Sequence, residues 1–228
     1  MEKKLITENI FWMKEQIVRF NELMDNDINN KNLIGTYAKL TEEEFRGEGE
    51  FLQSFLSDDK EGMLDGLIDL TFTSFYWYLL EGHTFKEEFI ERLINVEADM
   101  TSLKSDVEDL KYSIDKGLSY YTVNTLIRIL AKESIQSQFD ILGAFFNILE
   151  SNLSKLVLKG SVDTEKELVN ILAKGRYADV SIYEKVSDDK VYYAFKAMKD
   201  IQNGVTFKEP KLIKTSLFKE PELRSFIY

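Results

Sequence analysis

The feature that most constrains the fold is a segment, 61–80, that is apolar on nearly every side. Its sequence is EGMLDGLIDLTFTSFYWYLL. A helix that is apolar all round has to be covered by other elements, so this segment is predicted to be the central helix of a bundle. Gly82 marks its end. Both prolines of the chain, Pro210 and Pro221, come after residue 200, which suits a long helical body before them.

Other helices are expected on either side of this one. Apolar residues recur with a helical period over 7–25, and a polar loop, 25–32, follows. A first acidic helix is expected over 41–57, where Ser57-Asp58-Asp59 breaks it. The chain is therefore predicted to be mainly α.

A heptad pattern runs through 86–116. Its apolar residues recur at alternating steps of four and three: Phe89, Leu93, Val96, Met100, Leu103, Val107, Leu110 and Ile114. This spacing is typical of a coiled-coil seam. Two interpretations stay open, an intramolecular hairpin whose partner is a helix at 120–156 and a long intermolecular coil.

The pattern changes after Gly160. A short helix over 163–173 precedes two alternating runs, DVSIYEKV and KVYYAFKA, which predict a β-hairpin. The tail from Asn203 is expected to be largely irregular. We therefore expect a helical domain over 1–160, with a helical insertion at 84–138, and a C-terminal extension over 161–228.

Composition excludes several kinds of site and partner. The chain has no cysteine and one histidine, His83, so disulfides, thiolate sites and zinc sites built on several histidines are excluded. The net charge of −11 and the lack of a basic cluster argue against a nucleic-acid partner. There is no apolar run of about 18 residues, so no membrane span is expected. The N-terminus lacks an apolar signal core, which predicts a cytoplasmic protein.

Acidic residues lie on the apolar stripes of the two helices expected over 41–57 and 61–80. Glu44 and Glu48 are one turn apart on the first, and Asp65 and Asp69 are one turn apart on the second. Carboxylates on an apolar stripe are costly to bury unless something pairs with them. Their convergence predicts a site for a hard divalent cation, Mg²⁺ or Mn²⁺. The other interpretation is a solvated acidic face.

Three motifs in order carry a resemblance to a known family. They are Glu43-Glu44-Phe45-Arg46-Gly47 with Asp65-Gly66-Leu67-Ile68-Asp69, then Ser151-Asn152-Leu153-Ser154-Lys155, and last Gly204 to Pro210 followed by Pro221-Glu222-Leu223. The chain resembles the MazG-like all-α nucleoside triphosphate pyrophosphohydrolases, especially their virus-encoded branch. Two glutamates of the family's motifs are replaced here by Gly47 and Gly66. Glu48 or Glu50, each within one turn, would take the place of the first, and Asp65 would substitute for the second.

The resemblance implies a MazG-like bundle that cleaves a (d)NTP between its α- and β-phosphates with Mg²⁺. It implies that Glu44 and the acids of 65–69 bind the metal and that Glu43 positions water, so Glu43 and Glu44 are the candidate catalytic residues. Asn152 and Lys155 would contact the substrate phosphates. It also implies a homo-oligomer, a dimer or tetramer, in the host cytoplasm if the protein is viral.

Two other hypotheses remain for the function. One is a degenerate homologue that binds nucleotide without hydrolysing it. The other is a helical interaction protein that works through its heptad segment.

Overall fold

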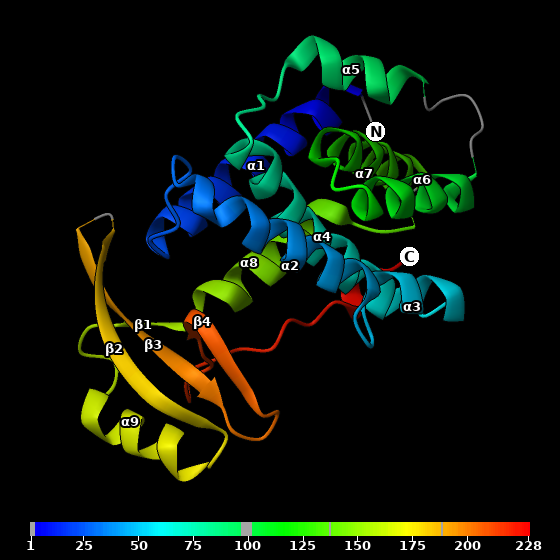
Figure 1. Cartoon of the computed structure of the whole chain (residues 1–228). Helices are drawn as coiled ribbons and strands as arrows, with labels where there is room; N and C mark the ends of the chain where they lie inside the picture. The colour runs from blue at the N-terminus through cyan, green and yellow to red at the C-terminus, as the bar shows by residue number, and fades with distance from the viewer. Residues whose placement is uncertain (1–2, 97–101, 137, 188) are drawn as a thin grey trace. The chain divides into compact units, whose positions relative to one another are not determined.

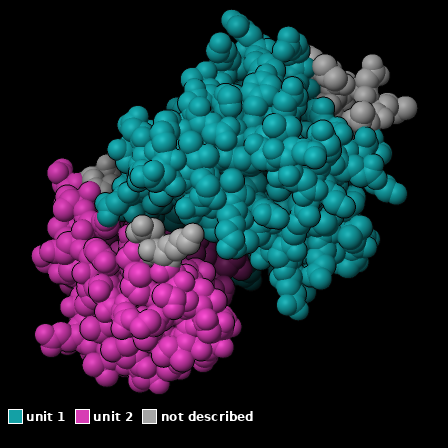
Figure 2. Space-filling view, in the orientation of Figure 1, with its two compact units in different colours: residues 1–148, 222–228 teal, residues 149–221 magenta. Residues whose placement is uncertain are grey.

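The computed structural model describes residues 3–96, 102–136, 138–187 and 189–228. It is mainly helical, with one antiparallel sheet near the C-terminus (Figure 1). The chain divides into two compact units, coloured separately in Figure 2. Unit 1 comprises residues 1–148 and 222–228, and unit 2 comprises 149–221. The sequence predicts a later division, after residue 160.

Helix α4 (Lys60–Leu80) is the central helix of unit 1, as the sequence predicts. Most of its residues are buried, including Leu64, Leu67 and Phe75. Among the helices packed against it are α1 (Lys3–Leu23), α2 (Ile34–Arg46), α3 (Phe51–Ser57) and α7 (Ser119–Gln136). The Asp59 side chain caps its start by accepting a hydrogen bond from the Gly62 N–H at 3.2 Å. Gly82 follows its end with φ 87°, in the left-handed region that favours glycine.

The first acidic helix is two helices rather than one, so the expectation of a single helix over 41–57 is wrong. Helix α2 ends at Arg46, and α3 begins at Phe51. Gly47 is extended, with φ −56° and ψ 163°, and Gly49 has φ 85°. The apolar residues keep a helical spacing across this break, but the two glycines end the helix and redirect the chain.

The heptad segment is also divided. Its described parts are α5 (Glu87–Val96) and α6 (Leu103–Asp115), while Met100 of the expected seam lies in 97–101, outside the described residues. Helix α6 packs against α7 of the same chain, as the hairpin interpretation requires. The expected partner helix over 120–156 is wrong as a single element, because α7 ends at Gln136 and α8 (Ile141–Leu153) starts anew.

Unit 2 is an antiparallel sheet with one helix on one of its faces. Its elements are β1 (Leu156–Leu158), α9 (Thr164–Ala173), β2 (Tyr177–Ser187), β3 (Lys190–Asp200) and β4 (Val205–Leu212). Strands β2 and β3 form the expected hairpin and pair along their whole length. β1 and β4 follow one another along the other edge of β3. Buried residues from both layers form its core: Val157, Ile171, Phe195, Ala197 and Ile213.

Strand β4 corrects the expectation of an irregular tail. It pairs with β3 from Asp200↔Val205 to Lys196↔Leu212, with an irregularity in register between the two ends. Pro210 lies within this stretch. A proline cannot donate to the ladder, and such irregular edge pairing is where sheets tolerate it. Two short 3₁₀ helices, η1 (Lys31–Leu33) and η2 (Arg224–Phe226), complete the fold.

Candidate acidic site

Acidic side chains from three elements meet in unit 1. Helix α2 carries Glu44, Glu50 immediately precedes α3, and one face of α4 carries Asp65 and Asp69. Helices α2 and α3 both pack against α4, and this packing brings the four residues together. All four are half-buried.

The electrostatics of Glu44 show how close these carboxyl groups are. Burial raises the pKa of Glu44 to about 8, and the negative charges of Asp69, Glu50, Asp65 and Glu43 add to the rise. A carboxyl group with such a pKa keeps its proton at neutral pH in the metal-free protein. A cation bound here would favour the ionised form instead.

Glu50 completes the group. Burial raises its pKa, and the charge of Asp65 raises it further, while a hydrogen bond with the Glu44 side chain opposes the rise. Because Glu44 retains its proton, it is the donor of this hydrogen bond and Glu50 accepts it. In the metal-free site, the proton of Glu44 therefore lies in a hydrogen bond between the carboxyl groups of Glu44 and Glu50.

The lack of a side chain at Gly47 leaves room for the side chain of Glu50. A Cβ at Gly47 would lie 2.7 Å from the Glu43 carbonyl oxygen and 2.8 Å from Cγ of Glu50. The Glu50 side chain thus occupies the space beside a position where the MazG-like motif has glutamate. The sequence leaves Glu48 and Glu50 as alternatives for this place, with Glu48 as the predicted metal ligand. Glu48 is exposed, and Glu50, not Glu48, is among the neighbours that act on Glu44.

Close packing of α3 on α4 explains why a glycine stands at position 66. A Cβ there would lie 2.6 Å from the backbone N of Phe51 and 2.7 Å from its Cα. The start of α3 approaches α4 so closely that no side chain fits. The glutamate that the resemblance leads us to expect at this position is therefore excluded by the backbone of Phe51, and Asp65 lies one position earlier.

Glu43, the candidate for positioning water, is at the rim of this group. It is exposed and pairs with Lys39, whose Nζ lies 3.1 Å from its Oε1. Its charge still contributes to the raised pKa of Glu44. An exposed carboxylate next to the acids can reach water, and its ion pair with an exposed lysine is weak.

The donor set suits a hard divalent cation, because all its ligands are carboxylate oxygens. The side chains as they stand are not a coordination sphere. Within the described parts of the chain, no three Asp, Glu, His or Cys side chains are arranged to hold a metal ion. Charges affect one another over longer distances than those between a metal ion and its ligands. The acids can therefore raise the pKa of Glu44 without being arranged to coordinate a metal ion. Binding would require Glu44 to lose its proton and the carboxyl groups to turn toward the cation.

Asn152 and Lys155 lie in unit 2, at the end of α8. Lys155 Nζ donates a hydrogen bond to Asn152 Oδ1 at 2.6 Å. The structure thus brings the two expected phosphate contacts together with each other. It likewise brings Glu44, Asp65 and Asp69 together within unit 1.

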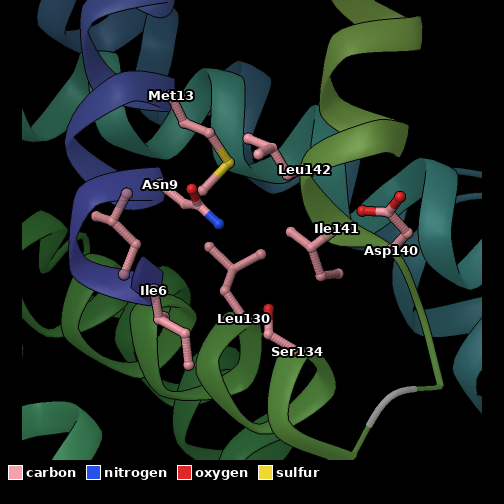
Figure 3. A pocket seen from close by; sticks show the side chains of 9 residues that line it. Ile6, Asn9, Met13, Leu130, Ser134, Asp140, Ile141 and Leu142 are labelled. Atoms are coloured by element: carbon pink, nitrogen blue, oxygen red, sulfur yellow. The ribbon is translucent and has the colours of Figure 1, made fainter. Parts of the chain in front are cut away.

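A small pocket in unit 1 lies among α1, α7 and α8 (Figure 3). Its volume is about 20 Å³, which is room for about one water molecule. Ile10, Met13 and Leu130 are among its lining residues, and none of the acids above belongs to the lining. The Asp140 carboxylate at its edge accepts a hydrogen bond from Gly143 N–H at 2.9 Å, at the start of α8. The pocket is too small for a nucleotide.

Comparison of the chain with protein-family models, with curated proteins and with solved structures found no match. Among the helices of the described residues, none combines the length and apolar character that crossing a membrane requires.

Proposed function

We propose that the acids of unit 1 bind a divalent cation and that the chain is a nucleoside triphosphate pyrophosphohydrolase. The observation that carries this proposal is the convergence of Glu44, Glu50, Asp65 and Asp69, with the pKa of Glu44 raised to about 8. Like charges gathered in a half-buried site destabilise it, and a bound cation would reverse that effect. The motif order of the MazG-like family supports the same reaction.

The proposed chemistry is hydrolysis of a (d)NTP between its α- and β-phosphates, giving a nucleoside monophosphate and pyrophosphate. A bound Mg²⁺ or Mn²⁺ would offset phosphate charge and lower the pKa of an attacking water. Glu44, Glu50, Asp65 and Asp69 would hold it. Exposed Glu43 would orient the water. Contact of Asn152 and Lys155 with phosphate is what the resemblance alone implies.

A second candidate is a nucleotide-binding protein without turnover. It is favoured by Gly66, because the backbone of Phe51 leaves no room for the family's glutamate there. A site that lacks one metal-binding side chain can keep its affinity for nucleotide while the rate of hydrolysis falls.

The test is pyrophosphate release from a panel of NTPs and dNTPs with Mg²⁺ or Mn²⁺. We expect release by the wild type and its loss in Asp69→Asn. Glu48→Gln is the matched control, since Glu48 is an exposed acid of the same region, and it should keep full activity. Nucleotide binding without release would favour the second candidate. Neither binding nor release, by folded protein, would leave the helical interaction protein as the better hypothesis.

A further inference from the structure

Strand β2 forms one edge of the sheet in unit 2. It pairs with β3 along its whole length, and among the described residues no strand pairs with its other side. The opposite edge of the sheet is built differently, because β1 has three residues and β4 carries Pro210 and an irregular register. Short strands, prolines and irregular pairing keep sheet edges from pairing with other chains. β2 has 11 residues and no proline.

The backbone groups on the free side of β2 belong to every second residue. In β3, the carbonyls of Val191 and Phe195 point away from β2, because they accept hydrogen bonds from the N–H groups of Lys159 at 2.8 Å and Ile213 at 2.9 Å. Backbone groups alternate in direction along a strand, so the residues between these two, and their partners in β2, bond the two strands together. Those partners in β2 are Ser181, Tyr183 and Lys185.

The residues that alternate with these partners direct their N–H and C=O groups outward. They are Val180, Ile182, Glu184 and Val186. Asp179, with φ 53°, and Asp189, with φ 59°, are in the left-handed region on either side of this stretch. Between them β2 pairs with β3 in unbroken register. The outward-facing residues are therefore placed symmetrically about Tyr183.

A second copy of β2 can pair antiparallel with this stretch about a twofold axis at Tyr183. Each Val180 then lies opposite Val186 of the second copy, and each Ile182 lies opposite Glu184. All four outward-facing residues find partners, and no like charges face each other. An axis at Glu184 would set two glutamates directly opposite each other. An axis at Ile182 would require pairing across the left-handed Asp179.

This pairing would also cover apolar side chains that are exposed in the single chain. Val186 is 73% exposed, and Tyr183 is 37% exposed. Opposite side chains of an antiparallel pair are in contact, so Val186 would pack on Val180 of the second copy and the two Tyr183 rings would lie beside each other. Nζ of Lys196 lies 5.3 Å from the centre of the Tyr183 ring, which helps to hold the ring on its face of the sheet.

We propose that the free edge of β2 pairs with β2 of a second copy, centred on Tyr183, and forms one continuous sheet across a dimer. In such pairing the main-chain hydrogen bonds give affinity and the side-chain register gives specificity. A single strand pair is a small interface, so the dimer should be weak and concentration-dependent. The interface lies in unit 2 and needs neither the acids nor a cation, so it does not rest on the proposed function.

The first test is sedimentation equilibrium of the full chain over a range of concentrations, where we expect a monomer–dimer equilibrium. Glu184→Pro should weaken dimerisation about tenfold or more, because each copy loses one hydrogen bond to the other. The Glu184 N–H points away from β3, so proline is compatible with the fold of unit 2. Glu184→Ala is the matched control. It removes the same side chain but keeps the N–H, and it should dimerise like the wild type.

The second test uses the absence of cysteine from the chain. Tyr183→Cys should give a disulfide-linked dimer under mild oxidation, because the two side chains lie directly opposite each other. Val186→Cys is the control, since Val186 is more exposed but lies far from its own equivalent in this register. Equal cross-linking of both variants would overturn the register. A dimer that Glu184→Pro leaves unchanged would overturn the interface. A wild type that is monomeric at every concentration would overturn the proposal and leave the edge to an extended segment of another protein.

Discussion

Unit 1 contains two groups of charged side chains that are neutralised in different ways. In the first, Asp106 of α6 is 1% exposed and forms ion pairs with two residues of α7, Lys132 and Arg128. In the second, Glu44 is surrounded by acids that raise its pKa. The first group balances its charge within the protein, and the second balances it by holding protons. A buried ion pair fixes how helices pack, whereas protonated acids can exchange their protons for a cation.

The largest effect should come from breaking the balanced group. Asp106→Asn removes the charge that faces Lys132, which is 5% exposed, and so breaks an ion pair between two buried side chains. We expect the free energy of unfolding to fall by about 3–5 kcal/mol, measured by urea denaturation. Asp109→Asn is the control, since Asp109 is exposed and pairs with Arg128 at 3.1 Å. It should cost less than about 1 kcal/mol. Similar small losses in both would mean that Asp106 does not hold α6 to α7.

Removing a carboxyl group from the acids around Glu44 should instead stabilise the protein at high pH. The folded-state pKa of Glu44 is about 8, above its ordinary value of 4.5. Below 4.5 the residue is protonated in both states, and between 4.5 and 8 the unfolded state loses its proton first. Stability should therefore fall as pH rises through this window in metal-free buffer. At pH 8, Glu44→Gln should be more stable than the wild type, by an amount on the order of a few kcal/mol.

Denaturation of both proteins at pH 5 and pH 8 measures this difference. Glu48→Gln should follow the wild type at both values. A wild type as stable at pH 8 as at pH 5, or a Glu44→Gln variant less stable at pH 8, would contradict the electrostatic account of the acids.

A smaller loss of stability should follow from adding a side chain at position 66. Gly66→Ala places a Cβ against the backbone of Phe51, so α3 has to shift away from α4. We expect a loss of about 1–3 kcal/mol, despite the better helix propensity of alanine. Gly35→Ala is the control, because nothing lies within 4 Å of a Cβ there and the residue is also helical. It should be neutral or stabilising. A stabilising Gly66→Ala would show that α3 is not seated on α4 at this point.

The sequence predicts the elements whose signals agree with one another. For α4, a continuous apolar surface and Gly82 both indicate one helix that ends near residue 80, and the structure has it at 60–80. The β2–β3 hairpin likewise follows from strict alternation around a polar turn. In both elements the pattern of apolar residues follows from which side chains are buried, so it predicts the type and the length of the element.

Elements whose signals conflict were missed. The apolar residues Phe45, Phe51 and Phe55 keep a helical spacing across the break between α2 and α3, so periodicity hides it. Gly47 and Gly49 were the signal that could have shown it. β4 was missed because Pro210 suggests irregular chain, and its pairing with β3 is a long-range contact that no local pattern encodes.

The same break explains how much of the site could be predicted. Asp65 and Asp69 were found because they are polar residues on an apolar helix. Glu44 is predicted by its spacing from Phe51, Leu52 and Phe55, which the structure places in α3. Glu48 is preferred to Glu50 as a ligand from the sequence, since counting turns along one continuous helix places Glu48 beside Glu44. Once the chain turns at 47–50, Glu50 faces Glu44 and Glu48 faces solvent.

The most direct test of the central claim is calorimetric titration of Mn²⁺ into the wild type and Asp69→Asn at pH 7, in buffers of different ionisation enthalpy. Because the pKa of Glu44 is about 8, cation binding at pH 7 should release close to one proton, and the release should decline as the pH rises through about 8. Asp69→Asn should bind far more weakly. Specific binding with proton release would support a cation site made by these acids. No binding by the folded wild type, or binding that Asp69→Asn leaves unchanged, would contradict it.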